Sequence, residues 1–264
     1  MSGPGALAGR GVLVSRPLAQ ARALSDAIRA AGGRPFEFPL IVIEPLGDVS
    51  QVAAAAARLD RAALAVFVSA NAVRHALDTL MSLRNWPAAL AAATVGLQSA
   101  QALRERGIQR IVVPPERFDS EGLLELPDLS AAALAGRQVL VFRGEGGREL
   151  LGDTLRERGA QVEYVTCYRR VSPRDGSLLC IALREGGLHA LTVTSSESLR
   201  NLVDLPGLDC LDALRVLPLF APHPRIATRA REHGFVRVIE TEPADAGLMA
   251  GLTDYFSSHA DEVS

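Results

Sequence analysis

Short apolar runs alternate along this chain with longer segments whose apolar positions follow a helical period. The first apolar run is Val12–Val14, and an amphipathic segment over Gln20–Ala31 follows it and stops at Gly32. Repeated alternation of a buried strand with an amphipathic helix is typical of a parallel sheet covered by helices on both faces. The pattern therefore predicts an α/β protein.

The same strand–helix unit occurs a second time. Val12–Pro17, with Arg16 at the end of the predicted strand, corresponds to Val139–Gly144, with Arg143 in the same place. Each segment is followed by a predicted helix and a glycine that ends it.

Two further pairs of segments correspond in the same order and at nearly the same spacing. In one pair each predicted strand ends in a serine, Ser69 or Ser195, which is suited to cap the following helix. Because three ordered blocks recur, we infer an internal duplication and expect two similar lobes with the active site in a cleft between them. The further pairs are Ala65–Arg74 with Leu191–Arg200, and Ala100–Ile111 with Ala227–Val238.

Two extended segments interrupt the alternation. Phe36–Pro45 and Glu163–Val171 each follow the first strand–helix unit of their half of the chain. We expect each segment to leave its lobe and form a connector.

Composition restricts the chemistry that the chain can perform. Its 264 residues fit two domains, and its net charge of −2 gives no field that would draw it to nucleic acid. All 28 basic residues are arginine. Without lysine, Schiff-base chemistry with pyridoxal phosphate and the lysine of an ATP- or GTP-binding P-loop are both excluded.

Cysteine and histidine usage argues against disulfides and metal sites. The three cysteines, Cys167, Cys180 and Cys210, are odd in number and form no CxxC pair, which argues against a disulfide framework or a zinc site. The five histidines show no metal-binding spacing. We therefore expect no metal and a reducing, cytoplasmic environment.

Neither a membrane segment nor an export signal is recognisable. No apolar run approaches the roughly 20 residues that a membrane helix needs. Met1–Arg10 lacks the apolar segment of a signal peptide, and we interpret it as a short flexible arm.

The ends of the predicted strands carry the candidates for anion binding. Arg16 and Arg143 are suited to bind a carboxylate or phosphate, and each could equally form a salt bridge within its lobe. Gly144 belongs to a glycine-rich loop that either binds an anion through its backbone N–H groups or is a simple turn. The loop lacks the GxGxxG spacing, so a dinucleotide is not expected.

Two serines, one loop and one tyrosine also have both a functional and a structural interpretation. Ser69 and Ser195 are expected first as helix caps, and neither lies in the GxSxG motif of a serine hydrolase. The loop from His223 to Arg225 either binds an anion or caps a helix. Tyr168 carries a phenol that can donate a proton without burying a charge, or it is a packing residue.

Taken in order, these segments resemble the uroporphyrinogen-III synthase family. No single motif is specific, but their order and spacing are, and they span residues 11 to about 252. The matching segments are Val12–Pro17, Pro39–Pro45, Phe67–Val73, Val95–Gly96 with Ser99–Ala100, Val139–Gly147, Val165–Val171, Val193–Ser196 and His223–Ala227.

The resemblance implies a particular lobe arrangement. Two similar α/β lobes, each a parallel sheet flanked by helices, would be joined by a two-stranded antiparallel β-ladder. Lobe 1 would comprise residues 1–38 and 174–264, the ladder 39–46 and 163–173, and lobe 2 47–162. Each lobe would then combine pieces of both halves of the duplication.

The resemblance also implies a reaction. Such an enzyme closes the linear tetrapyrrole hydroxymethylbilane into uroporphyrinogen III, inverts ring D and releases water, without a cofactor or a metal. A monomer is expected, in transient contact with the preceding enzyme of the pathway, and with no nucleic-acid or membrane partner. The rival interpretations are a two-lobed binding protein without catalysis and a homologue that has become a regulator.

Site residues follow from the resemblance position by position. Tyr168 matches the family's candidate general acid. Ser99 stands where the family has a threonine and keeps the hydroxyl, whereas Ile226 lacks it, so His223 and Arg225 are expected to supply contacts there. The substrate-binding set implied is Arg16, Ser69, Asn71, Gly96, Ser99, Arg143, Gly144, Ser195, Ser196, His223 and Arg225.

Overall fold

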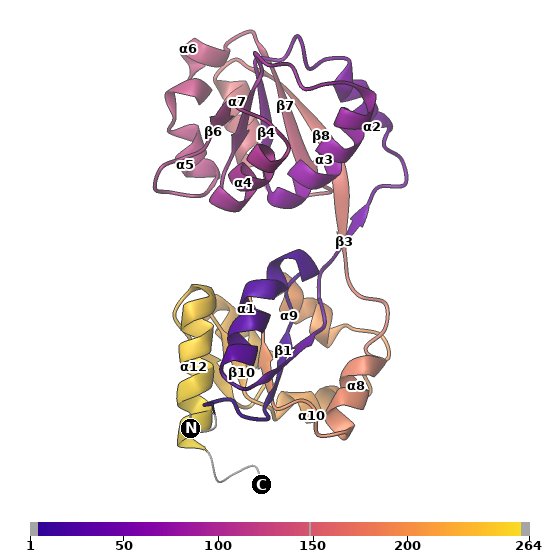
Figure 1. Ribbon diagram of the computed structural model, residues 1–264, viewed down its shortest axis with the longest axis vertical. Coiled ribbons are helices and arrows are strands. Elements are labelled where there is room, and N and C mark those ends of the chain that lie inside the picture. Colours follow the sequence, from indigo (N-terminus) through magenta and orange to yellow (C-terminus); the bar gives the residue numbers. More distant parts are fainter. Residues whose placement is uncertain (1–4, 148, 260–264) are drawn as a thin grey trace. The chain divides into compact units, whose positions relative to one another are not determined.

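The chain forms two compact α/β units (Figure 1). The structure is a computed structural model, and it describes residues 5–147 and 149–259. Unit 1 comprises the chain up to Val42 and from Val171 onward, and unit 2 comprises Ile43–Arg170. Unit 2 is therefore inserted in sequence between the two parts of unit 1.

Unit 1 is a five-stranded parallel sheet covered on both faces by helices. Its strand order is β11-β10-β9-β1-β2. Val12 and Val14 pack on the face of α1 and α12, and Leu13 packs on the opposite face, as strand alternation requires. The strands are β1 (Gly11–Val14), β2 (Arg34–Glu37), β9 (Ala190–Thr192), β10 (Leu219–Ala221) and β11 (Val238–Glu240); the helices are α1 (Leu18–Ala30), α8 (Ser177–Arg184), α9 (Ser196–Val203), α10 (Leu211–Arg215), α11 (Pro224–Glu232) and α12 (Ala244–Ser258).

Unit 2 has a six-stranded sheet in the order β3-β8-β7-β4-β5-β6. Helices α2, α3 and α4 cover one face, and the segments from α5 to α7 cover the other. The strands are β3 (Val42–Pro45), β4 (Leu64–Phe67), β5 (Ala91–Thr94), β6 (Ile111–Val112), β7 (Gln138–Gly144) and β8 (Gln161–Val171); the helices are α2 (Ser50–Ala56), α3 (Ala70–Leu83), α4 (Leu97–Glu105), α5 (Ser120–Leu124), the 3₁₀ turn η1 (Pro127–Leu129), α6 (Ala131–Leu134) and α7 (Leu150–Glu157).

The two sheets share one strand order, as the duplication predicts. Strands β11, β10, β9, β1 and β2 of unit 1 correspond in position to β6, β5, β4, β7 and β8 of unit 2. Each sheet takes strands from both halves of the chain. The predicted fold class, two similar α/β units with parallel sheets and an antiparallel strand pair, is confirmed.

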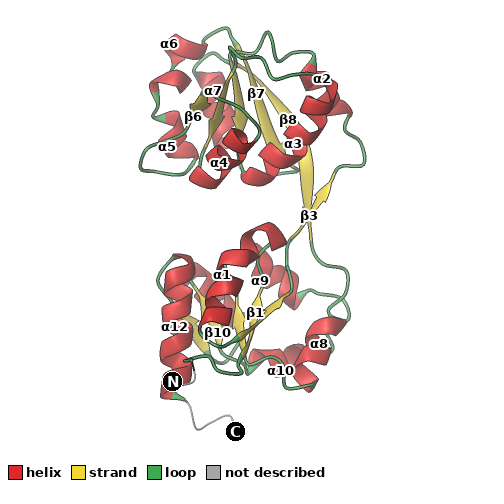
Figure 2. Ribbon diagram, viewed as in Figure 1, coloured by secondary structure: helices red, strands yellow, loops and turns green. Residues whose placement is uncertain are grey.

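The antiparallel pair is formed by β3 and the last part of β8 (Figure 2). An ion pair of 2.7 Å between Glu44 and Arg169 joins the two strands. Leu40 still donates its N–H to the Ser15 carbonyl of unit 1, and β8 is paired with β7 from Gln161 to Tyr168. The paired ladder is therefore shorter than the two extended segments in the sequence.

Two expectations from the sequence are wrong. Cys180 and Cys210 form a disulfide, with Cα atoms 5.4 Å apart, because α8 and the start of α10 pack on the same face of the unit 1 sheet. An odd cysteine count did not reveal that pairing; Cys167 remains a buried free thiol. The flexible arm expected over Met1–Arg10 is wrong where the structure describes it, because Leu7 is fully buried against α1 and donates its N–H to the Ala31 carbonyl; residues 1–4 lie outside the described residues.

Candidate functional site

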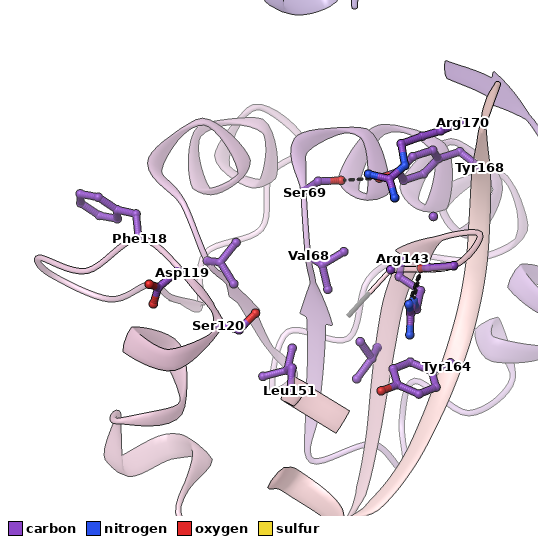
Figure 3. A pocket seen from close by; sticks show the side chains of 15 residues that line it. Val68, Ser69, Phe118, Asp119, Ser120, Arg143, Leu151, Tyr164, Tyr168 and Arg170 are labelled. Carbon is purple, nitrogen blue, oxygen red and sulfur yellow. Dashed lines mark hydrogen bonds between the residues drawn. The ribbon is translucent and has the colours of Figure 1, made fainter. Parts of the chain in front are cut away.

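A pocket of about 310 Å³ lies at the carboxyl end of the unit 2 sheet (Figure 3). This is the edge at which parallel α/β sheets bind ligands. The pocket brings together three residues predicted from the sequence, Ser69, Arg143 and Tyr168, with the Gly144 loop. Its lining consists of Val68, Ser69, Val95, Phe118, Asp119, Ser120, Val141, Arg143, Gly144, Gly146, Gly147, Leu151, Tyr164, Tyr168 and Arg170.

Ser69 caps α3 and also contacts Tyr168. It follows β4 in an extended conformation, and its Oγ accepts a hydrogen bond of 3.1 Å from the Ala72 N–H. The same Oγ lies 3.1 Å from the Tyr168 hydroxyl, and the two side chains point toward one another in Figure 3. The cap and the pocket contact therefore use one side chain.

Tyr168 is aimed by a β-bulge in β8. Arg143 of β7 pairs with Thr166, but the next residue, Gly144, pairs with Tyr168, so one extra residue is inserted in β8. Tyr168 consequently packs beside Cys167 on the α3 face rather than on the face that Tyr164 occupies. Bulges of this kind commonly re-aim a side chain at a functional site.

The ring of Tyr168 needs the glycine opposite it. A Cβ at Gly144 would lie 2.7 Å from the ring, closer than carbon atoms approach one another. The ring also stacks against His75, with centroids 5.7 Å apart. Tyr168 is thus held with only 6% of its surface exposed.

The Arg143 guanidinium contacts the glycine-rich loop and the helix start that follows it. Its Nε and Nη2 donate to the Gly146 carbonyl, and its Nη1 lies 2.9 Å from a Glu149 carboxylate oxygen. Its guanidinium carbon lies 4.5 Å from the centroid of the Tyr164 ring. The salt-bridge interpretation of Arg143 is therefore realised, and the arginine shapes the loop whose Gly146 and Gly147 line the pocket.

Hydrogen bonding and burial shift the pKa values of the two residues around this arginine. Hydrogen bonds from Tyr164 and then from Arg143 lower the pKa of Glu149. Burial raises the pKa of Tyr164, and the nearby Glu149 adds to the shift. The loop therefore holds a carboxylate, a guanidinium and a neutral phenol in contact.

Three predicted residues of unit 2 lie outside this pocket. Asn71 is buried in the first turn of α3, Gly96 is the N-cap of α4, and Ser99 is buried within α4. Val95, which precedes Gly96 in the sequence, does line the pocket.

The predicted residues of unit 1 gather at the ends of their strands and at the starts of its helices. Ser195 caps α9, and its Oγ accepts a hydrogen bond of 2.9 Å from the Ser198 N–H. The Oγ of Ser196 is buried and has no hydrogen-bond partner among the described residues. His223 caps α11 through Nδ1, which accepts 3.0 Å from the Arg225 N–H. Both helix-cap interpretations are realised in unit 1.

Arg16, the counterpart of Arg143, also forms an ion pair. Its Nη1 contacts Oδ1 of Asp245 in the first turn of α12. The salt-bridge interpretation is therefore realised in both units, with acids from unrelated places in the sequence.

Several pocket residues were not predicted from the sequence. Tyr164 and Arg170 lie on β8 on either side of Tyr168, and Phe118, Asp119 and Ser120 come from the start of α5. Asp119 is a residue type that commonly caps helices, and its side chain caps α5 by accepting a hydrogen bond of 2.7 Å from the Gly122 N–H. Nothing in the sequence placed that helix start beside β7.

Residues 5–147 and 149–259 contain no group of three or more His, Cys, Asp or Glu side chains placed to hold a metal ion. In the same residues, none of the helices combines the length and hydropathy needed to cross a membrane.

Comparison with known proteins points to one family. The family model described as uroporphyrinogen-III synthase HemD matches residues 22–250. The uroporphyrinogen-III synthase of Escherichia coli (strain K12) is 34% identical over 244 residues, which covers 90% of this chain and 98% of that protein. The enzyme of that name from Synechococcus elongatus is 34% identical over 211 residues, covering 75% of each chain.

Solved structures show the same fold at lower identity. A mutant uroporphyrinogen III synthase from the extremely thermophilic bacterium Thermus thermophilus superposes with a TM-score of 0.55 at 20% identity, covering 94% of this chain and 98% of that one. Uroporphyrinogen-III synthetase from Helicobacter pylori 26695 gives 0.53 at 15% identity, with the same coverage. From the family match and the identity to its relatives, the chain belongs to the uroporphyrinogen-III synthase family.

Proposed function

We propose that this protein closes hydroxymethylbilane into uroporphyrinogen III, with inversion of ring D and loss of water, as a hydro-lyase of tetrapyrrole biosynthesis. The observation that carries the proposal is the Tyr168 hydroxyl, which lines the unit 2 pocket and is held 3.1 Å from Ser69. The family match over residues 22–250 supplies the reaction class.

In this proposal Tyr168 assists the departure of the hydroxyl group. The electron pair of the terminal pyrrole expels the hydroxyl of the CH₂OH group, and a phenol donates a proton to the departing oxygen as water forms. Ser69 Oγ, already accepting from the Ala72 N–H, fixes where the Tyr168 hydroxyl sits. The pyrrole itself drives bond cleavage, so the step requires no cofactor.

The second task of the protein is geometric. The azafulvene formed by loss of water is attacked at the substituted carbon of ring D, and a spiro intermediate rearranges before the ring closes. Because the substrate is already reactive, holding it so that only the inverting closure is reachable is the main contribution expected of the protein. A pocket of about 310 Å³ accommodates part of such a chain.

The eight carboxylates of the substrate explain the other proposed contacts. Starts of helices and arginines bind carboxylates without requiring a basic protein, which agrees with a net charge of −2. We propose contacts from both units at the ends of their sheets. In unit 2 these are Ser69, Asn71, Gly96, Ser99, Arg143 and Gly144; in unit 1 they are Arg16, Ser195, Ser196, His223 and Arg225.

We further propose a cytoplasmic monomer that makes transient contact with the preceding enzyme of the pathway. A cytoplasmic location implies reduced thiols, so Cys180 and Cys210 would form their disulfide only under oxidising conditions.

The test of the function is the isomer produced. Purified protein supplied with hydroxymethylbilane is expected to yield uroporphyrinogen III, whereas spontaneous closure yields uroporphyrinogen I. Chromatographic separation of the oxidised products distinguishes them. Type I product alone, at stoichiometric protein, would refute the catalytic proposal and leave the two non-catalytic interpretations, a binding protein and a regulator.

A further inference from the structure

We propose that Asp245 is a positioning residue for Arg16, and that the pair forms a carboxylate receptor in unit 1, whereas the matching Arg143 of unit 2 uses more of its guanidinium for contacts within its own unit. The inference rests on the proposed function, because the carboxylates to be bound are those of a tetrapyrrole substrate.

The two equivalent arginines differ in how much of the guanidinium is in use. Arg143 spends three nitrogens on Gly146 and Glu149, and 8% of its side chain is exposed. In the described part of the chain, the Arg16 guanidinium makes one contact, from Nη1 to Asp245, and 17% of its side chain is exposed. A guanidinium has five N–H donors in a fixed fork, so Arg16 keeps an edge for a bidentate carboxylate.

Asp245 directly follows a residue in an unfavourable backbone conformation. Ala244, the first residue of α12, has φ 67°, and it is the one residue other than glycine with a positive φ among those that the structure describes. A Cβ disfavours this conformation, which persists where surrounding contacts demand it and is enriched at functional sites.

The start of α12 is also folded tightly onto the turn before it. A Cβ at Gly247 would lie 2.0 Å from the Glu242 carbonyl oxygen, so that position admits no side chain. With the strained Ala244, this tight turn brings the Asp245 carboxylate to an arginine 229 residues away in the sequence. The first turn of a 15-residue helix also favours the negative charge of Asp245.

An alternative role for Asp245 predicts the opposite effect. An internal carboxylate that competed with the substrate would be displaced on binding, and its removal would tighten binding. Asp245 contacts one terminal nitrogen of the fork, which fits a residue that fixes the side chain and leaves the other edge accessible.

The experiment is a double-mutant cycle of Asp245→Asn and Arg16→Ala. Binding of uroporphyrin III, an oxidised tetrapyrrole with eight carboxylates, is measured by fluorescence titration, and kcat and KM are measured with hydroxymethylbilane. Asp245→Asn is expected to raise Kd and KM about three- to tenfold with kcat within about twofold, and to add nothing in the Arg16→Ala background. Asp26→Asn, which removes an exposed ion pair of 2.9 Å with Arg29 on α1, is the matched control and should change neither constant.

Three outcomes would overturn the inference: unchanged Kd and KM in Asp245→Asn, tighter binding, or an increase that persists when Arg16 is absent. Should Asp245→Asn fail to fold, the cycle is repeated in an Ala244→Gly background, because glycine relieves the positive φ. Type I product from a wild-type protein that binds uroporphyrin III would refute the proposed function, while the binding arm of the cycle would still decide the role of Asp245.

Discussion

The unit 2 pocket is lined by two tyrosines, and the hydroxyl of Tyr168 lies within hydrogen-bond distance of the Ser69 hydroxyl. Tyr164 also lines the pocket, but its hydroxyl donates a hydrogen bond of 3.3 Å to the backbone carbonyl of Glu149, and its ring lies against Arg143. The Tyr168 hydroxyl instead lies 3.1 Å from Ser69 Oγ, and its ring packs against Gly144 and His75. Two tyrosines at one site thus have different surroundings and are expected to have different roles.

Removing the Tyr168 hydroxyl should therefore slow turnover selectively. For Tyr168→Phe we expect kcat to fall about 10²-fold, the usual contribution of a positioned acid, with little change in KM. The ring remains to pack, so the melting temperature should stay close to that of the wild type. Tyr164→Phe is the matched control and should retain most of the activity. Equal kcat in Tyr168→Phe and wild type would exclude the tyrosine from the mechanism.

His189 makes stability depend on pH. Its Nδ1 accepts a hydrogen bond of 2.9 Å from the Gly11 N–H, which a protonated imidazole cannot do. Burial lowers the pKa of His189, and the charges of Arg10 and Arg34 add to the shift.

The sign of the pH effect follows from that lowered pKa. The unfolded chain binds a proton at His189 near pH 6.5, whereas the folded chain resists it to lower pH. The contribution is therefore fully present above about pH 6.5 and is lost as pH falls through the folded pKa. Thermal unfolding of wild type and His189→Gln between pH 8 and 5 checks this: the wild type should lose more stability on acidification. Parallel pH profiles would contradict it.

At the scale of elements, sequence patterns predict strands and helices better than the contacts between them. Apolar runs such as Val12–Val14 and the capping residues Ser69 and Ser195 depend on local physics, and the structure places them as expected. The side-chain direction of Tyr168 cannot be predicted in this way, because a single bulge reverses the alternation of β8 at that point. No periodicity in the sequence indicates which residue is the inserted one.

The pairing between β7 and β8 yields a prediction about that bulge. Gly144→Ala would place a Cβ 2.7 Å from the Tyr168 ring, so the tyrosine must move. We expect a loss of stability of about 1–3 kcal/mol and a fall in kcat close to that of Tyr168→Phe. The double variant should be no slower than either single one. Gly47→Ala, with no atom within 4 Å of the added Cβ, is the control; an active Gly144→Ala would show that Tyr168 need not be fixed.

The disulfide between α8 and the start of α10 should stabilise unit 1 when it is formed. A cross-link between residues 30 positions apart restricts the unfolded chain and contributes about 3–4 kcal/mol in the loop-entropy treatment. Reductant should lower the melting temperature of the wild type and leave a Cys180→Ala/Cys210→Ala variant unchanged. Thiol trapping in cells should find both cysteines reduced if the protein is cytoplasmic; a disulfide found there would contradict the proposed location.

For the whole molecule, the sequence predicts the duplication but not how each repeated residue is used. Arg16 and Arg143 occupy equivalent places. Their ion-pair partners differ, however, because Asp245 lies in the first turn of α12 and Glu149 is the N-cap residue of α7. Cys180 and Cys210 likewise meet through packing rather than through a spacing motif. Local patterns repeat because they are set by neighbouring residues. The Arg16–Asp245 ion pair and the Cys180–Cys210 disulfide depend instead on tertiary contacts that the two halves do not share.

Each unit has a complete core of its own. The two apolar clusters of unit 2 contain only residues between Ile43 and Tyr168, and those of unit 1 only residues outside that range. Unit 2 is also continuous in sequence, whereas unit 1 is divided by it. A compact unit with its own hydrophobic core is expected to fold alone.

We therefore expect the excised segment Ile43–Arg170 to fold without the rest of the chain. It should show cooperative thermal unfolding and helical circular dichroism, because both faces of its sheet keep their helices. Its pocket, with Ser69 and Tyr168, should persist, but production of uroporphyrinogen III should be lost together with the unit 1 contacts. Nuclear magnetic resonance of the excised segment measures its folding, and the isomer assay measures the loss. If the excised segment fails to fold, the two cores depend on one another although they have no residues in common. If it folds and yields uroporphyrinogen III, unit 1 has no part in the proposed mechanism.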